Sequence, residues 1–332
     1  MAAGMERKGE MKATIVIPNY NGIAYLKKCM ASLKADCADC PAHIIVVDNG
    51  STDGSVRWME EAHPDAELIA LPENTGFSGA VNRGIRSAKT PYVILLNNDT
   101  EIRPGFVKAL VEAMEADNRL FSVSAKMLDM KNENLVDSAG DFYCALGWAF
   151  ARGKGKPADR YEKPASVFSA CAGAAIYRRS VFDRIGFFDE LHFAYLEDVD
   201  IGWRARIHGY RNAFEPKACV LHAGSAASGS RYNAFKVRLS SANSVYVIGK
   251  NMPFLQWIIN LPFLLPGFLI KALFFAKKGM GGIYCKGCIR GLKRCFAKEG
   301  RASKVRFSFS HLGNYICIQA QLWVNLFRRL YN

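Results

Sequence analysis

The sequence predicts an α/β protein with a doubly wound, mainly parallel sheet, followed by a helical C-terminal region. Through residues 13–125, short apolar runs alternate with helix-like stretches at the spacing of βα units. These runs are nearly continuous in Val, Ile and Leu, which is typical of parallel strands covered on both faces. The last part of the chain is instead both apolar and basic, which indicates a different environment.

The elements follow in order along the chain. Asp53 precedes the helical stretch GSVRWMEEA, and Pro104 opens PGFVKALVEAMEA, as expected at helix N-termini. This alternation predicts a nucleotide-binding α/β half. The predicted strands are 13–18, 43–48, 67–71, 92–97 and 120–126.

Beyond residue 126 the pattern changes. The stretches DSAGDFYCALGWAF and ASVFSACAGAAIYRRS indicate strands or loops that extend the sheet in a mixed arrangement. The stretch IGWRARI predicts a helix, and 214–224 predicts a strand that ends near His222. We therefore divide the chain into a polar N-terminal extension, a nucleotide-binding domain and a helical region, at 1–11, 12–250 and 251–332.

Composition excludes several classes of protein. Half of the 332 residues are hydrophobic, so the chain is not mainly disordered. The first apolar run is too short for the core of a signal peptide.

The ten cysteines include two CxxC pairs, Cys37/Cys40 and Cys285/Cys288, far apart and in unlike contexts. Reduced thiols in a cytosolic protein are favoured over a metal site or disulfides.

Polar loops follow three of the predicted strands: PNYNG, DNGSTDGS and NNDT. In doubly wound sheets, ligands bind beyond the carboxyl ends of the strands, so these loops predict a ligand site at one edge. Asp and Asn are also ordinary turn residues, but three such loops are harder to attribute to turns alone. The glycine-rich stretch NTGFSGAVNRGI is not GxGxxG, and no Walker A loop occurs, which disfavours dehydrogenases and P-loop enzymes.

Carboxylates cluster in the stretch Glu197-Asp198-Val199-Asp200. Acids are favoured in a first helical turn, and Asp200 can pair with Arg204 one turn later. Asp198 is less well explained in this way, and crowded carboxylates raise one another's pKa, which suits a general base. Asp99 is either a turn residue or a hard-oxygen ligand for Mg²⁺ or Mn²⁺. His222 is either a structural histidine or part of the same site.

Seven motifs then keep their order and spacing: TIVIPNYNG, VVDNGSTDGS, NTGFSGAVNRGI, LLNNDT, CAGAAIYRRSVFDRIGFFDE, LEDVDIGWRARIHGY and VLHAGS. The sequence resembles the family 2 inverting glycosyltransferases with the GT-A fold, specifically their rhamnosyltransferase-like branch, over about residues 12 to 250. The resemblance implies a GT-A nucleotide-sugar-binding domain.

The resemblance also implies roles for residues near the donor nucleotide. The loop with Pro18, Tyr20 and Asn21 would contact the nucleoside, and Asp48 would hydrogen-bond the pyrimidine base. Asn82 lies in the motif that borders the nucleotide pocket.

The metal and the chemistry are placed by the later motifs. Asn97-Asn98-Asp99 stands where the family has DxD, so Asp99 is the retained metal ligand for Mg²⁺ or Mn²⁺, with Asn97 near the ribose. With an amide replacing the first acid, His222 would complete the metal shell. In the Glu197-Asp198 motif, Asp198 would be the base. Trp203 and Arg204 would lie near donor and acceptor.

The C-terminal region predicts membrane association. From residue 251 on, 13 Lys and Arg face a single acid, so this region carries +12 of the chain's +14. The apolar run 253–276 is long enough to cross a bilayer, but Pro262 and Pro266 are expected to break it, which favours an interfacial helical hairpin over a span. A buried or dimer-forming helix pair, and hence an oligomer, is the soluble alternative. Nucleic acid would attract the charge but would not explain the Phe and Leu content.

These expectations combine into one functional hypothesis. The protein transfers a sugar with inversion from dTDP-rhamnose or a UDP-hexose to a lipid-linked or oligosaccharide acceptor, on the cytoplasmic face of the cell membrane. A nucleotidyltransferase would need a basic, glycine-rich triphosphate loop after the first strand, where PNYNG stands. A non-catalytic nucleotide-sugar or glycan-binding membrane module is the remaining alternative.

Overall fold

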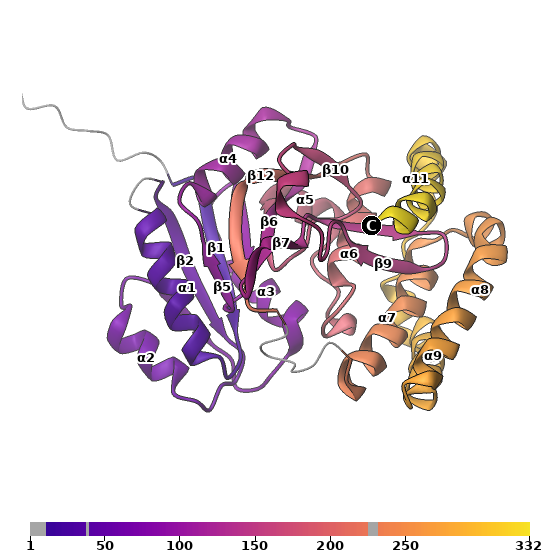
Figure 1. The fold of residues 1–332 in the computed structure, drawn as a ribbon, viewed down its shortest axis with the longest axis horizontal. Helices are drawn as coiled ribbons and strands as arrows, with labels where there is room; N and C mark the ends of the chain where they lie inside the picture. Colours follow the sequence, from indigo (N-terminus) through magenta and orange to yellow (C-terminus); the bar gives the residue numbers. More distant parts are fainter. Residues whose placement is uncertain (1–10, 38–39, 225–231) are drawn as a thin grey trace, which may run out of the picture.

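The computed structural model describes residues 11–37, 40–224 and 232–332. The predicted N-terminal extension therefore lies outside the described residues except for Met11. The molecule has a sheet-centred part, whose strands run from Ala13 to His222, and a helical part that holds its C-terminal end (Figure 1).

The main sheet is mostly parallel, as predicted. Its order is β10-β12-β6-β11-β4-β1-β2-β3, with β5 paired to β12 and β7 paired to β6. β11 is antiparallel to both its neighbours, and β10 is antiparallel to β12. The strands are β1 Ala13–Asn19, β2 Ala42–Asp48, β3 Glu67–Ala70, β4 Tyr92–Leu96, β5 Thr100–Ile102, β6 Leu120–Asp129, β7 Asn132–Ser138, β10 Ala165–Val167, β11 Ala174–Arg178 and β12 Arg211–His222.

The predicted strands agree with this sheet. All five early strands are present with ends that shift by at most a few residues, and the late strand ends at His222 as expected. A separate hairpin, β8 (Asp141–Cys144) and β9 (Trp148–Ala151), projects from the sheet toward the helical part (Figure 1). The mixed extension of the sheet after residue 126 is thus confirmed.

Helices cover both faces of the sheet, which explains the continuous apolar strands. One face packs against α1, α2 and α4, and the other against α3, α5 and α6. β4 is buried along its whole length, so the polar turn that follows it has a rigid support. The helices are α1 Ile23–Asp36, α2 Ser55–Ala62, α3 Gly76–Ser87, α4 Phe106–Ala116, α5 Arg179–Ile185 and α6 Glu197–Ile207.

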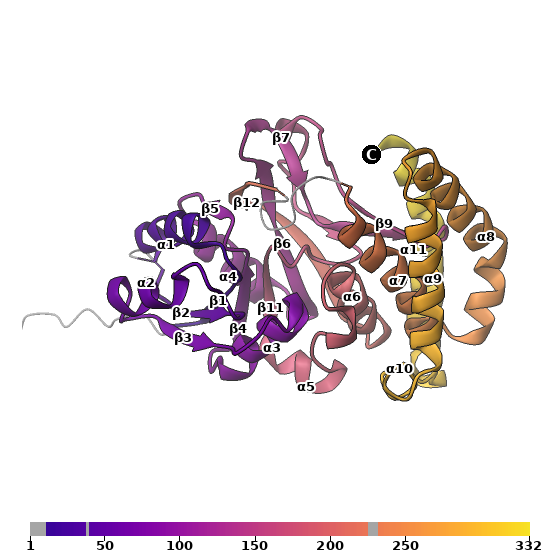
Figure 2. The ribbon, with the colours of Figure 1, turned by 90° about the horizontal axis from the view of Figure 1, so that it is seen from below.

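The C-terminal region is helical, and α8 is its outermost helix (Figures 1 and 2). The predicted break in 253–276 is wrong: α8 is one helix of 24 residues that contains Pro262 and Pro266. Both prolines are exposed. The helices are α7 Ala234–Asn251, α8 Phe254–Lys277, α9 Gly281–Phe296, α10 Lys298–Ala302 and α11 Leu312–Tyr331.

The helical region shares a core with the sheet-centred part. Leu264 of α8 and Leu322 of α11 belong to the same buried cluster as Phe168 and Trp203. The expected boundary at residue 250 falls at the end of α7, but apolar contacts continue across it. The C-terminal helices therefore pack into the same hydrophobic core as part of the sheet-centred region.

The polarity of α8 is the reverse of that of an ordinary surface helix. Its buried amides face the protein, where Asn260 and Gln319 of α11 exchange hydrogen bonds of 2.7 and 2.9 Å. Its exposed side carries apolar side chains, including Phe254 at 77% and Leu265 at 64% exposure. Among the described residues, α8 is the one helix long and apolar enough to cross a membrane, and most of it is not buried.

Candidate active site

A cavity of about 670 Å³ lies where the sheet meets the helical part. The predicted loops after β1 and β4 line one side, and α6, α7 and α8 contribute to the other. Eight of the residues predicted from the sequence line it together: Pro18, Tyr20, Asn97, Asn98, Asp99, Glu197, Asp198 and His222. The expected convergence of strand ends at one site is therefore present.

Side-chain amides hold the strand ends in register. Asn19, at the end of β1, donates to Asp48 at the end of β2 (2.9 Å) and accepts from Asn98 after β4 (2.7 Å). Gly22 packs directly against the Asn98 amide, so a larger residue there would displace it. Asn98 is thus fixed relative to the first loop through Asn19, whereas the Asn97 backbone amide donates to Gly173 O (2.8 Å).

One corner of the cavity is built around His222. The antiparallel pairing of β12 with β5 sets His222 opposite Thr100, which brings it beside Asp99. His222 Nε2 lies 3.3 Å from Asp99 Oδ1, and His222 Nδ1 lies 2.9 Å from Asp137 Oδ2 of β7. Lys154 also pairs with Asp137. We call Asp99, Asp137 and His222 the cation corner.

The charges of this corner follow from its contacts. Burial disfavours the charged forms, but the hydrogen bonds to Asp137 and Asp99 raise the pKa of His222 to about 9. Burial alone would raise the pKa of Asp137, but contacts with His222 and Lys154 lower it to about 2. The carboxylates of Asp99 and Asp137 therefore lie on either side of the positively charged His222 ring.

The donor set of the cation corner fits a divalent metal. Asp99 offers a hard carboxylate oxygen and His222 an imidazole nitrogen, and both line the cavity. Asp137 binds the other ring nitrogen, which is how proteins orient a metal-ligating histidine. The protonated His222 would give up its Nε2 proton when a metal binds.

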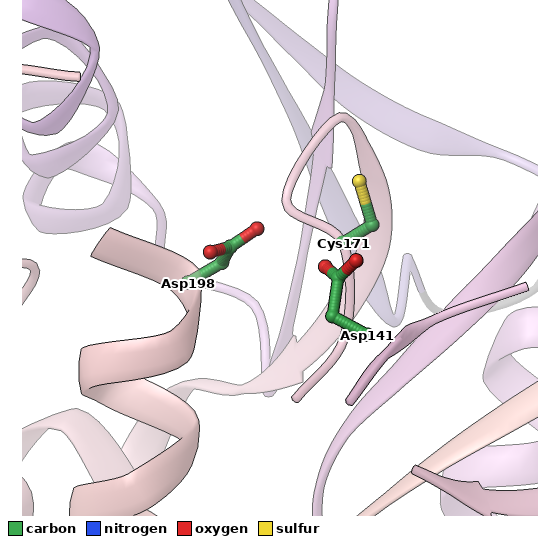
Figure 3. A group of neighbouring side chains, drawn as sticks. All are labelled: Asp141, Cys171 and Asp198. Atoms are coloured by element: carbon green, nitrogen blue, oxygen red, sulfur yellow. The ribbon is translucent and has the colours of Figure 1, made fainter. Parts of the chain in front are cut away.

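A second corner contains Asp141, Cys171 and Asp198, whose ligand atoms lie within 4.8 Å of one another. Asp198 stands at the start of α6 with its carboxylate pointing toward the other two (Figure 3). Asp141 begins β8, and its amide is fixed by a 2.9 Å hydrogen bond to Ser169 O. We call this group the proton corner.

Protonation is favoured here. Burial raises the pKa of Asp141 well above its usual value, and the neighbouring charge and hydrogen bond of Asp198 add to this. Burial also raises the pKa of Asp198. Burial and then Asp198 raise the pKa of Glu197 to about 8. Aspartate thus behaves differently in the two corners, because Asp137 contacts His222 and Lys154, whereas the proton corner consists of two carboxyl groups and a thiol.

The backbone before Asp198 is strained. Phe193, Tyr195 and Leu196 all have positive φ, between 62° and 71°. Such conformations persist only where the surroundings enforce them. The Asn243 side chain of α7 does so by donating to the carbonyls of His192, Ala194 and Tyr195 at 2.8–2.9 Å. A helix outside the sheet therefore holds the loop that presents Asp198.

Five predicted residues lie outside the lining. Asn21 accepts a hydrogen bond from the Thr52 amide, Asp48 supports Asn19, and Asn82 holds Phe188 through hydrogen bonds to both its backbone groups. These three shape neighbouring loops. The remaining two are Trp203 and Arg204.

Trp203 and Arg204 lie on α6, whose first turn borders the cavity, but their side chains point elsewhere. Trp203 is fully buried against Tyr143 and Phe168, because it faces the core side of α6. Arg204 binds Asp200, as the alternative in the sequence suggested, and also donates to the carbonyls that follow α5. Neither side chain lines the cavity.

Sequence reasoning missed four residues of the cavity and its support: Asp137, Asp141, Cys171 and Asn243. Three lie in stretches for which the sequence predicts only a mixed extension of the sheet. Asp137 and Asp141 sit at the ends of short strands, DSAGD, which is the signal that could have found them. Asn243 lies within a helix and carries no such signal.

Two solved proteins share this fold. S. aureus TarS 1–349 in complex with UDP-GlcNAc has a TM-score of 0.59 at 17% identity, over 89% of this chain and 84% of that one. The mannosyltransferase PcManGT from Pyrobaculum calidifontis, in complex with GDP-Man and Mn²⁺, has a TM-score of 0.52 at 18% identity, over 94% and 84%. This chain therefore shares its fold with two proteins that were solved with nucleotide sugars bound.

Sequence comparison names the family. The model of glycosyl transferase family 2 matches residues 14–186, more than half of the chain, so the chain belongs to this family. The N-acetylglucosaminyl-diphospho-decaprenol L-rhamnosyltransferase of Mycobacterium tuberculosis is 28% identical over 63% of this chain and 75% of its own length. The low-salt glycan biosynthesis hexosyltransferase Agl10 of Haloferax volcanii is 25% identical over 80% and 85%.

Proposed function

We propose that the protein is an inverting glycosyltransferase that moves a sugar from dTDP-rhamnose or a UDP-hexose to a hydroxyl of a lipid-linked saccharide, in cell-surface glycan synthesis. The observation that carries this proposal is the single cavity that contains both corners. Family membership and the lipid-linked acceptor in the name of the mycobacterial relative support it.

The cation corner would hold the donor's diphosphate. Asp99 and His222 would bind Mg²⁺ or Mn²⁺, which supplies positive charge to the departing nucleoside diphosphate. Asp137 would keep the His222 ring oriented. The amides of Asn97 and Asn98 face the same cavity and would hydrogen-bond the nucleotide's sugar.

The proton corner would perform the chemical step. Asp198 would accept the proton of the acceptor hydroxyl while the oxygen attacks the anomeric carbon from the face opposite the leaving group. A raised pKa brings a carboxylate closer to the pH at which it works, which suits a general base. Asp141 lies close enough to share that proton.

The exposed apolar side of α8 supports association with the cytoplasmic membrane surface as a peripheral or monotopic protein. The basic residues of the C-terminal region would add attraction to anionic lipids. This placement would bring the cavity near lipid-linked acceptors.

The proposed function is tested by thermal-shift measurements with UDP- and dTDP-sugars, with and without Mn²⁺. We expect at least one nucleotide sugar to raise the melting temperature, and Mn²⁺ to increase the shift, because a ligand that binds only the folded state stabilises it. The variant Asp99→Asn should lose the Mn²⁺-dependent part. If no nucleotide sugar stabilises the protein, the proposal is wrong.

A further inference from the structure

Lys271 is an unusual residue of α8. It lies in the most apolar helix of the protein, yet it lines the catalytic cavity instead of the exposed side. Its ammonium group lies 5.5 Å from the centre of the Trp148 ring, which is itself fixed by a 3.0 Å hydrogen bond to Gly267 O. Burial lowers the pKa of Lys271 to about 8, so the amine remains charged at neutral pH.

The amine has a cation–π contact but no carboxylate at ion-pair distance within the described part of the chain. The contrast with Lys250 of α7 is clear, because that buried amine binds Asp189 at 2.7 Å and Asp200 at 2.8 Å. Burying a charge without an opposite partner is costly. Lys271 therefore has the properties of a group whose anionic partner is a ligand.

The facing helix offers matching groups. Lys236, Ser240 and Ser244 recur every four residues on one side of α7, and all three line the cavity. Residues four apart lie on the same face of a helix, so these three form one polar stripe. The two amines are suited to phosphate oxygens, and the two hydroxyls, which donate to the backbone carbonyls of Val237 and Ser240, keep this side of α7 polar. We call Lys236, Ser240, Ser244 and Lys271 the helical end of the cavity.

The donor's diphosphate is already assigned to the cation corner, so a second anion-binding end calls for a second anionic group. The helical end is formed by α7 and α8, and α8 exposes apolar side chains on its other side. An acceptor with a charged head and a hydrocarbon chain fits this arrangement.

We propose that Lys271, with the α7 stripe, binds the diphosphate of a lipid-linked acceptor at the helical end of the cavity. The inference rests on the proposed function and deepens it by naming the acceptor class and a residue that selects it. Trp148 positions the amine. Its hairpin also carries Asp141, so the same short element borders both the acceptor's phosphate and the proton corner.

The experiment compares the full-length protein with Lys271→Met, using farnesyl diphosphate as the probe in calorimetric titrations. We expect the variant to bind the probe about tenfold or more weakly, since hydrogen bonds to charged groups are among the stronger ones. Lys271→Arg should keep most of the affinity. Lys277→Met removes an exposed charge from the same helix and should have little effect.

Three further ligands show which part of the probe Lys271 contacts. Farnesol, which lacks the phosphates, should bind the wild type and Lys271→Met equally. UDP and dTDP with Mn²⁺ should also bind both proteins equally, because their diphosphate belongs to the cation corner. Melting temperatures of the two proteins should agree closely, which excludes misfolding as the cause.

Three results would overturn the inference: no binding of farnesyl diphosphate to the wild type, equal binding by both proteins, or a parallel loss of nucleotide binding in Lys271→Met. The last would assign the amine to the donor. Any of these can occur while nucleotide sugars still stabilise the wild type, in which case the proposed function stands. A wild type that binds prenyl diphosphate but no nucleotide sugar would refute the proposed function instead.

Discussion

The cation corner and the proton corner border the same cavity and are both built around a pair of aspartates, yet these aspartates favour different protonation states. In the cation corner, His222 and Lys154 keep Asp137 ionised. In the proton corner, Asp141 and Asp198 are buried beside one another, and burial raises the pKa of both. The comparison shows that the neighbours of a carboxylate, not its residue type, decide whether it attracts a cation or a proton.

The largest expected effect concerns Asp198. The variant Asp198→Asn should lower the rate of sugar transfer by about 10²–10⁴-fold, because the amide cannot accept the acceptor's proton. Donor affinity should be unchanged, since the nucleotide is assigned to the other corner. Radiolabelled transfer and donor titration measure the two quantities on one preparation.

The exposed Asp183 provides a matched control, as Asp183→Asn makes the same chemical change on the surface of α5. Undiminished transfer by Asp198→Asn would remove this residue as the base and favour a non-catalytic binding module. A parallel fall in donor affinity would show that the two corners do not act separately.

A smaller effect is expected for the support of the cation corner. Asp137→Asn should weaken Mn²⁺ binding by about 10–100-fold, the usual cost of losing a group that orients a ligating histidine. The affinity is measured by titration of Mn²⁺ followed by electron paramagnetic resonance. Asp159→Asn, at an exposed position, is the control. Unchanged Mn²⁺ affinity would mean that metal binding does not depend on the contact between Asp137 and the His222 ring.

A pH dependence of stability is expected to arise at Glu197, which neighbours the proton corner. Burial and the charge of Asp198 raise its pKa from 4.5 to about 8, so the folded state binds this proton more tightly than the unfolded chain does. Its contribution to stability is complete below pH 4.5 and is lost as the pH rises through about 8. Glu197→Gln should therefore reduce the loss of stability across this window.

Urea unfolding at several pH values measures the effect of Glu197→Gln. The comparison protein is Glu133→Gln, which changes an exposed glutamate on β7. Identical pH profiles for the wild type and Glu197→Gln would show that Glu197 is not protonated in the folded protein.

The sheet and one side of the cavity could be predicted from sequence because they depend on local patterns. Apolar runs buried on both faces identify the strands, and topology then requires their carboxyl ends to meet, which brought Asp99 and Asn98 to one edge. The pairing of β5 with β12 placed His222 beside Asp99, as the resemblance implied.

The features that could not be predicted from the sequence depend on contacts between segments that are far apart in the chain. Trp203 and Arg204 occupy a helix beside Asp198, but the helix rotates them away from the cavity, which a linear motif does not reveal. Asn243 and Lys271 reach the site from helices 45 and 73 residues after Asp198. Pro262 and Pro266 were expected to break α8, but tertiary packing on α11 overrides this preference.

The hold of Asn243 on the strained loop has a consequence for protein engineering. Asn243 accepts a 2.7 Å hydrogen bond from Arg294 of α9, so the segment before Asp198 is connected to the C-terminal helices through two side chains. A chimera joined at residue 250 would combine α7 with a foreign α9 and separate this pair. Acceptor preference should therefore be exchanged between relatives by grafting α7 through α11 as one block, with the loop contacts of Asn243 kept intact.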